Sequence, residues 1–176
     1  MSASTATGAV AVWIGGSSVL LPSLLAGSQQ TVLTVFLPIP VVASLALSLD
    51  SRLAAFEAAA FRSPRTHEVL FVATFLAACL AASAAVASTV AVATFRNAAF
   101  LTGLMLAARP WARQASVIAP VLWIAVVVFF SRTPYPDPDW WTVLPEPVSA
   151  PHAALTAVAT LATGLTVHLC ARPELP

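Results

Sequence analysis

The stretch Asp50–Phe71, with the sequence DSRLAAFEAAAFRSPRTHEVLF, decides how this chain is divided. It holds seven charged or titratable side chains within nineteen residues, namely Asp50, Arg52, Glu57, Arg62, Arg65, His67 and Glu68. Strongly apolar sequence precedes it and follows it, which indicates a polar connection between membrane-spanning segments. We therefore predict an all-α fold, in which a single domain forms a polytopic membrane bundle of about six transmembrane helices.

The composition of the whole chain indicates the same environment. Of its 176 residues, 59% are hydrophobic and 9% are charged, and the mean hydropathy is +0.89. Soluble domains carry about 25% charged residues, so we expect a multi-pass protein of the cell membrane whose surface contacts the lipid bilayer. The net charge of +1, without a basic patch, excludes nucleic acid as a partner.

The apolar segments predict where the chain crosses the membrane, because a helix needs about 20 apolar residues to span the hydrocarbon core. The predicted spans cover residues 8–26, 31–49, 69–88, 90–108, 116–130 and 153–170. Pro38 and Pro40 then lie near the middle of the second span, where proline frees carbonyl groups that neighbouring helices must satisfy. Residues 131–152 form an outer loop rich in proline and aromatic side chains.

Two positions compete for the turn between the third and fourth spans. A turn near Ser88–Thr89 places Arg96 inside the fourth span, whereas a turn at Arg96–Asn97 makes the third span long and the fourth short. Inside the span, Arg96 has two alternatives. Its side chain either snorkels to the headgroups, or faces the bundle interior with Asn97, where the two would contact a partner or an anionic substrate in a pore.

The loop charges predict the orientation. Six spans place both termini on one side of the membrane, together with most of the arginines, which are Arg52, Arg62, Arg65, Arg109, Arg113 and Arg172. By the positive-inside rule this side is cytoplasmic.

Residues 51–62 are predicted to form a separate cytoplasmic helix of the coupling type. At about 100° per residue, Glu57 falls on an apolar face with Leu53, Phe56 and Phe61. One interpretation is a helix that lies on the headgroups. The other is a docking helix whose aromatic and acidic face fits a groove on a partner protein.

Motifs for chemistry are missing from the sequence. The chain has no Walker A loop and no HExxH, CxxC or GxSxG sequence, so we expect no enzyme activity, no catalytic or metal-binding residues and no cofactor. No acid lies at mid-membrane depth, which disfavours a proton-coupled carrier. For His168 we expect a hydrogen bond to a neighbouring helix.

The Asp50–Phe71 stretch resembles the segment between spans two and three in permease subunits of six-span, type-2 ATP-binding-cassette exporters. The resemblance is carried by Phe56-Glu57, Ser63-Pro64-Arg65 and Glu68-Val69-Leu70. The later stretch Arg96–Leu104, with the tryptophan-rich loop that follows, is similar to small actinobacterial membrane proteins of this permease-like kind.

This resemblance implies an export permease subunit that pairs with itself or with a similar subunit. It also implies docking of a separate ATPase through the 51–62 helix, by Leu53, Phe56, Glu57, Phe61 and Arg65. The rival hypothesis is a non-transport membrane protein for assembly or self-protection, which binds a partner through the same helix or a hydrophobic compound in its bundle.

Overall fold

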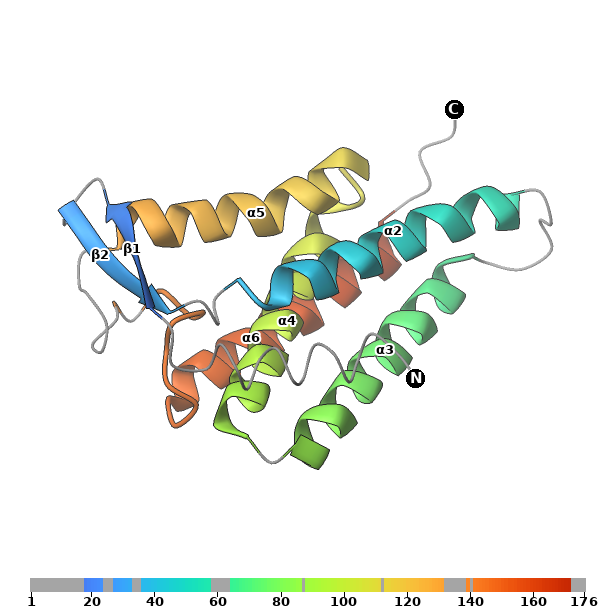
Figure 1. Cartoon of the computed structure of the whole chain (residues 1–176). Coiled ribbons are helices and arrows are strands. Elements are labelled where there is room, and N and C mark those ends of the chain that lie inside the picture. The colour runs from blue at the N-terminus through green and yellow to red at the C-terminus, as the bar shows by residue number, and fades with distance from the viewer. Residues whose placement is uncertain are drawn as a thin grey trace.

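The computed structural model describes residues 18–23, 27–32, 36–57, 64–86, 88–111, 113–131, 139 and 141–171. In these residues the chain forms a β-hairpin and five helices (Figure 1). The elements are β1 (Ser18–Ser23), β2 (Gly27–Val32), α2 (Pro38–Glu57), α3 (Pro64–Val86), α4 (Thr89–Ala108), α5 (Arg113–Phe130) and α6 (Pro151–Cys170). The described chain is therefore predominantly helical, as the sequence predicts.

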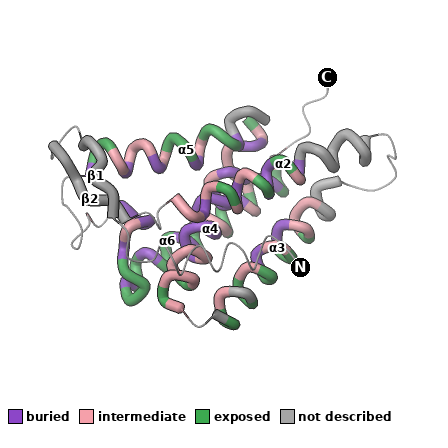
Figure 2. Tube along the Cα trace, in the orientation of Figure 1, coloured by how far each residue is buried: buried purple, intermediate pink, exposed green. Residues whose placement is uncertain are grey.

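Helix α4 lies at the centre of the bundle and packs against α2, α3, α5 and α6. In α4, 56% of the apolar segment is buried, compared with 18% in α3 and 22% in α6. Figure 2 shows the buried positions of α4 gathered from Arg96 onward, while its first turns are intermediate or exposed, and the other helices show buried positions among intermediate and exposed ones. The other helices thus shield α4 from the surroundings.

Three of the described helices are long and apolar enough to cross a membrane. Their apolar segments are Glu68–Ala85, Thr89–Ala108 and Pro151–Cys170. Helices α2 and α5 contribute shorter apolar segments, Pro38–Leu49 and Ser116–Phe130. Within the described residues, length and composition therefore support three candidate spans rather than the six predicted.

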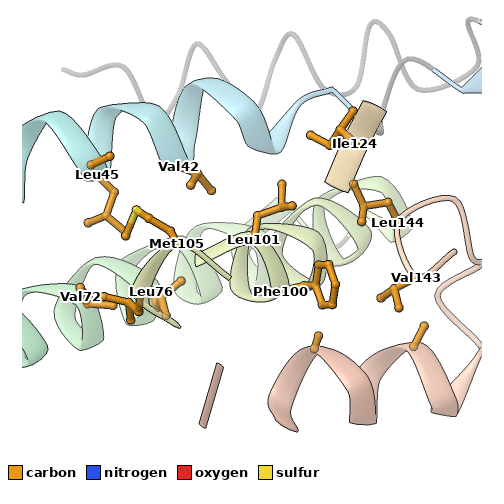
Figure 3. Packing of buried hydrophobic residues seen from close by; sticks show 14 of the residues in the cluster. Val42, Leu45, Val72, Leu76, Phe100, Leu101, Met105, Ile124, Val143 and Leu144 are labelled. Carbon is orange, nitrogen blue, oxygen red and sulfur yellow. The ribbon is translucent and has the colours of Figure 1, made fainter. Parts of the chain in front are cut away.

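The hydrophobic core joins all five helices and the segment that precedes α6 (Figure 3). Its members include Val42, Leu45, Val72, Leu76, Phe100, Leu101, Met105, Ile124, Val143 and Leu144. Large apolar side chains also lie exposed on the outer faces of the candidate spans, such as Leu70 and Leu80 of α3 and Leu155 and Val158 of α6. The molecule is thus apolar both inside and outside.

The helix predicted over residues 8–26 is wrong at residues 18–23, which form β1, and its other residues lie outside the described part of the chain. β1 pairs antiparallel with β2, and Ser18 lies opposite Val32. Pro22 would remove a hydrogen bond from a helix interior, whereas both strands of a two-stranded hairpin are edges and tolerate proline. The Gly15-Gly16 pair just before β1 also disfavours a helix.

The second predicted span is displaced along the chain. Helix α2 begins at Pro38 rather than near residue 31, so Pro38 and Pro40 occupy its first turn, where the missing N–H groups cost no intrahelical hydrogen bond. The helix then continues through Asp50 to Glu57. Residues 51–57 of the separate helix predicted over residues 51–62 are therefore the last part of α2, whereas residues 58–62 lie outside the described part of the chain.

The break between α3 and α4 lies near Ser88–Thr89, the first of the two turn positions predicted from the sequence, and not at Arg96–Asn97. Helix α3 ends at Val86, and α4 begins at Thr89 after Ser88, whose backbone is extended. Arg96 consequently lies inside α4. Helices α5 and α6 begin three and two residues earlier than predicted, at Arg113 and Pro151.

Candidate functional site

Two polar sites lie towards opposite ends of α4. We call them the Arg96 site, formed by Arg96, Asn97 and the carbonyl groups of residues 143–147, and the Glu68 site, formed by Glu68, Arg109 and His168. Arg96 is the eighth of the 20 residues of α4, and Arg109 follows its last residue. Arg109 lies thirteen positions after Arg96, which corresponds to about 20 Å along a helix.

At the Arg96 site, one guanidinium group binds the backbone of a distant segment. Nη2 donates hydrogen bonds to the carbonyl oxygens of Glu146 at 2.7 Å, Val143 at 3.1 Å and Leu144 at 3.4 Å. Nη1 donates to the carbonyl oxygen of Pro147 at 3.0 Å. The segment before α6 is therefore wrapped around the end of the Arg96 side chain.

Asn97 completes this site. Its Oδ1 accepts a hydrogen bond from Arg96 Nε at 3.2 Å, and its Nδ2 donates to the carbonyl oxygen of Leu144 at 2.8 Å. Arg96 is 7% exposed and Asn97 is 2% exposed. Of the two alternatives for Arg96 inside the span, the structure shows the side chain in the bundle interior rather than snorkelling.

The charge of Arg96 is stabilised mainly by carbonyl dipoles. In the described residues no carboxylate forms an ion pair with Arg96, although Glu146 interacts with it electrostatically over a longer distance. The carboxylate of Glu146 is buried, and its Oε1 lies 3.3 Å from Nε2 of His152, which is about half exposed. The segment that Arg96 holds thus also carries a carboxylate that interacts with Arg96 electrostatically.

At the Glu68 site, a single carboxylate oxygen links three helices. Oε2 of Glu68 lies 2.8 Å from Nε2 of His168 and 3.9 Å from Nε of Arg109. Glu68 lies near the beginning of α3 and Arg109 at the end of α4, so the carboxylate and the guanidinium also suit the dipoles of their helices, and His168 lies at the end of α6. The hydrogen bond predicted between His168 and a neighbouring helix is confirmed.

Helices α4 and α6 run in the same direction and make backbone contact between the two sites. A Cβ atom built at Gly103 would lie 2.6 Å from the backbone nitrogen of Leu161 and from the carbonyl group of Thr160. A Cβ at Gly164 would meet the carbonyl group of Gly103. Glycine at both positions is therefore what permits this close crossing, which fixes the relative height of the two helices.

For the predicted docking residues, the structure describes at most the helix to which each belongs. Leu53, Phe56 and Glu57 belong to the last turns of α2, and Arg65 to the first turn of α3. Phe61 lies outside the described residues, as do the side-chain positions of the other four. Their contact with a partner stays a prediction.

The role of Glu68 and Arg109 as partners was not predicted from the sequence. A signal was present, since an acid opens the third apolar run while an arginine follows the fourth and a histidine closes the sixth. The topology predicted from the sequence already placed all three on one side.

No family model, curated protein or solved structure matches the chain.

Proposed function

We propose that this protein is a multi-pass protein of the cell membrane and the permease subunit of an ATP-driven exporter, which docks a separate ATPase at the end of α2. One observation carries the proposal: the polar connection between α2 and α3 leads directly into the Glu68 site. Helix α2 extends beyond its apolar part to Glu57, and α3 begins at Pro64, four residues before Glu68. A force on this connection therefore reaches α4 and α6 through Glu68.

The exposed apolar side chains support a lipid environment. Leu155 is 70% exposed, Val158 66% and Leu70 63%, and all three lie on candidate spans. Further large apolar side chains are exposed on α3, α5 and α6, and exposed apolar surface of this kind marks contact with a partner protein or a membrane. In a bilayer it is the expected lipid-facing surface, because the helices satisfy their own backbone hydrogen bonds.

The Glu68 site belongs at the cytoplasmic end in this proposal. Arg109 lies there, and the positive-inside rule places it on the side of the arginine-rich loops. The end of α6 then also faces the cytoplasm. Docking from this side would bring an ATPase to the α2–α3 connection, as the resemblance implies.

Rigid-body movement is the mechanism that this arrangement supports. Closure of an ATPase pair would push the end of α2 and tilt α2 and α3 together. The hydrogen bond and ion pair of Glu68 would transmit the tilt to α6 and α4. As in exporters of this kind, the active unit would contain two permease subunits, either two copies of this chain or this chain with a similar one.

Glu57→Arg tests the docking. We expect this variant to lose copurification of the ATPase encoded beside this chain, because it reverses the charge at the centre of the proposed docking surface. Membrane insertion and solubility in mild detergent should not change. Leu47→Ala is the control, since Leu47 is 69% exposed on the apolar part of the same helix and should leave copurification intact. Undiminished copurification of Glu57→Arg contradicts the proposal.

The non-transport hypothesis is the second candidate, and one observation favours it. The Gly103–Gly164 contact closes the space between α4 and α6, and carbonyl groups of the chain itself surround the guanidinium of Arg96. A bundle of this kind offers a substrate little room in the conformation described. If the chain purifies without any ATPase, an assembly or self-protection role becomes the better proposal.

A further inference from the structure

We infer that residues Thr142–Pro147 form a re-entrant plug that closes the bundle at the Arg96 site, and that Arg96 and Asn97 hold this plug in place. The inference goes beyond the proposed transport function and does not depend on it. It changes the assignment of this segment from an outer loop in water to a part of the membrane-embedded core.

The depth of Arg96 is the first observation. Arg96 lies seven positions after Thr89, the first residue of α4, which corresponds to about 10 Å along the axis. The whole of Thr89–Ala108 is a candidate span. Since Arg96 binds the carbonyl groups of Val143 and Leu144 directly, the plug reaches well below the end of α4.

The packing of the plug is the second observation. Val143 is 3% exposed and Leu144 is 2% exposed, and both belong to the same core cluster as Phe100 and Ile124. Figure 3 shows the two plug side chains beside Phe100 of α4, with Ile124 of α5 close to Leu144. Non-helical backbone at membrane depth is tolerated only where protein buries it or water reaches it, and here protein buries it.

The chemistry of the plug matches Arg96. Pro145 and Pro147 have no backbone N–H group, so this stretch of buried backbone is rich in hydrogen-bond acceptors and poor in donors. A guanidinium is a fork of five N–H donors without an acceptor. It can therefore satisfy several adjacent carbonyl groups at once, whereas a lysine ammonium at position 96 offers only three donors from one atom.

Turns on both sides of the plug define its limits. Thr142 bonds to the carbonyl oxygen of Asp139 through its N–H at 2.8 Å and its hydroxyl at 2.6 Å. The N–H of Ala150 donates to the carbonyl oxygen of Pro147 at 3.1 Å, directly before α6. The plug can therefore be released as a unit, because two turns separate it from its neighbours.

Cysteine accessibility tests the plug in the full-length protein, reconstituted in liposomes. In a background of Cys79→Ala and Cys170→Ala, one cysteine is placed at Leu144, inside the plug, or at Val148, which is 38% exposed. A membrane-impermeant maleimide should label Val148→Cys readily and Leu144→Cys hardly at all. Equal labelling at the two positions would show that the segment is an open loop and would overturn the inference.

The role of Arg96 is tested by introducing Arg96→Ala into the protein that carries Leu144→Cys as its single cysteine. Loss of even one hydrogen bond to a charged group should raise the labelling rate of Leu144→Cys by about tenfold or more, and Arg96→Lys should give a smaller increase. Leu155→Ala is the control, since Leu155 is 70% exposed on the outer face of α6, and it should leave the labelling rate unchanged. Should Arg96→Ala fail to fold, Arg96→Lys and Asn97→Ala provide the same comparison. Continued protection of Leu144→Cys in every variant at Arg96 and Asn97 would show that these two residues do not hold the plug, and would overturn the inference.

Discussion

At the scale of single residues, Thr102 differs from the other described threonines. It is fully buried in α4, and its Oγ1 has no hydrogen-bond partner. Thr94 of the same helix donates from its hydroxyl to the carbonyl oxygen of Val90 at 2.8 Å, the usual arrangement of threonine in a helix. A buried hydroxyl without a partner lowers the free energy of unfolding.

Thr102→Val should therefore stabilise the protein, by about 1 kcal/mol, because the isosteric methyl group removes an unsatisfied polar atom. The measurement is the midpoint of thermal unfolding in detergent. Thr94→Val is the matched control and should be neutral or slightly destabilising, since it removes a satisfied hydroxyl. If Thr102→Val proves the more destabilising of the two, the hydroxyl of Thr102 has an acceptor in the membrane-embedded protein.

At the scale of elements, the crossing of α4 and α6 depends on Gly103. In an ordinary helix, replacing glycine with alanine is favourable by about 1 kcal/mol. Here we expect Gly103→Ala to destabilise the protein by about 1–3 kcal/mol, because the added methyl group would clash with the backbone of Thr160 and Leu161. Unfolding in detergent measures this effect.

The partner glycine provides the control. Gly164→Ala should act in the same direction, and the double variant should cost less than the sum of the two single variants, since either methyl group already separates the helices. An alanine at Gly103 that stabilises the protein would show that α4 and α6 cross at a greater distance.

The sequence predicts α5 and α6 to within three residues, because apolar length and flanking proline or charge define them locally. It does not predict the beginning of α2. Pro38 is compatible with a kinked span and with a first turn, and only packing against α4 distinguishes the two. The contact between Gly103 and Gly164 cannot be predicted from the sequence either. Other small residues that lie four apart on one helix, such as Ala78 and Ala82, could equally well have marked a close helix crossing.

The Arg96 site shows the same limit. A turn near Ser88 is one of two alternatives that the local sequence allows, and it places Arg96 inside a helix. The sequence then leaves open whether the Arg96 side chain snorkels or faces the bundle interior. Its partners are 47 to 51 residues away in the chain and are backbone carbonyl groups, which every residue has. Pro145 and Pro147 make this segment rich in acceptors, but they do not identify Arg96, rather than another donor, as its partner.

At the scale of the whole molecule, α4 connects the Arg96 site with the Glu68 site. Near one end, Arg96 holds the plug, and at the other end Arg109 and His168 meet Glu68 of α3. Between them lies the Gly103–Gly164 contact, which prevents α4 and α6 from sliding past one another. A displacement of α3 at the Glu68 site would thus move α4 and α6 together.

Insertion of this bundle in a membrane requires that its two ends face opposite sides. Trp111 is 84% exposed and follows Arg109, whereas Val148 lies just beyond the plug. In the background without Cys79 and Cys170, we expect an impermeant maleimide to label Val148→Cys from outside intact cells, and Trp111→Cys only in inside-out vesicles, as the positive-inside rule requires. Labelling of both cysteines from the same side would mean that α5 does not cross the membrane, and the bundle would then lie partly on the bilayer surface rather than through it.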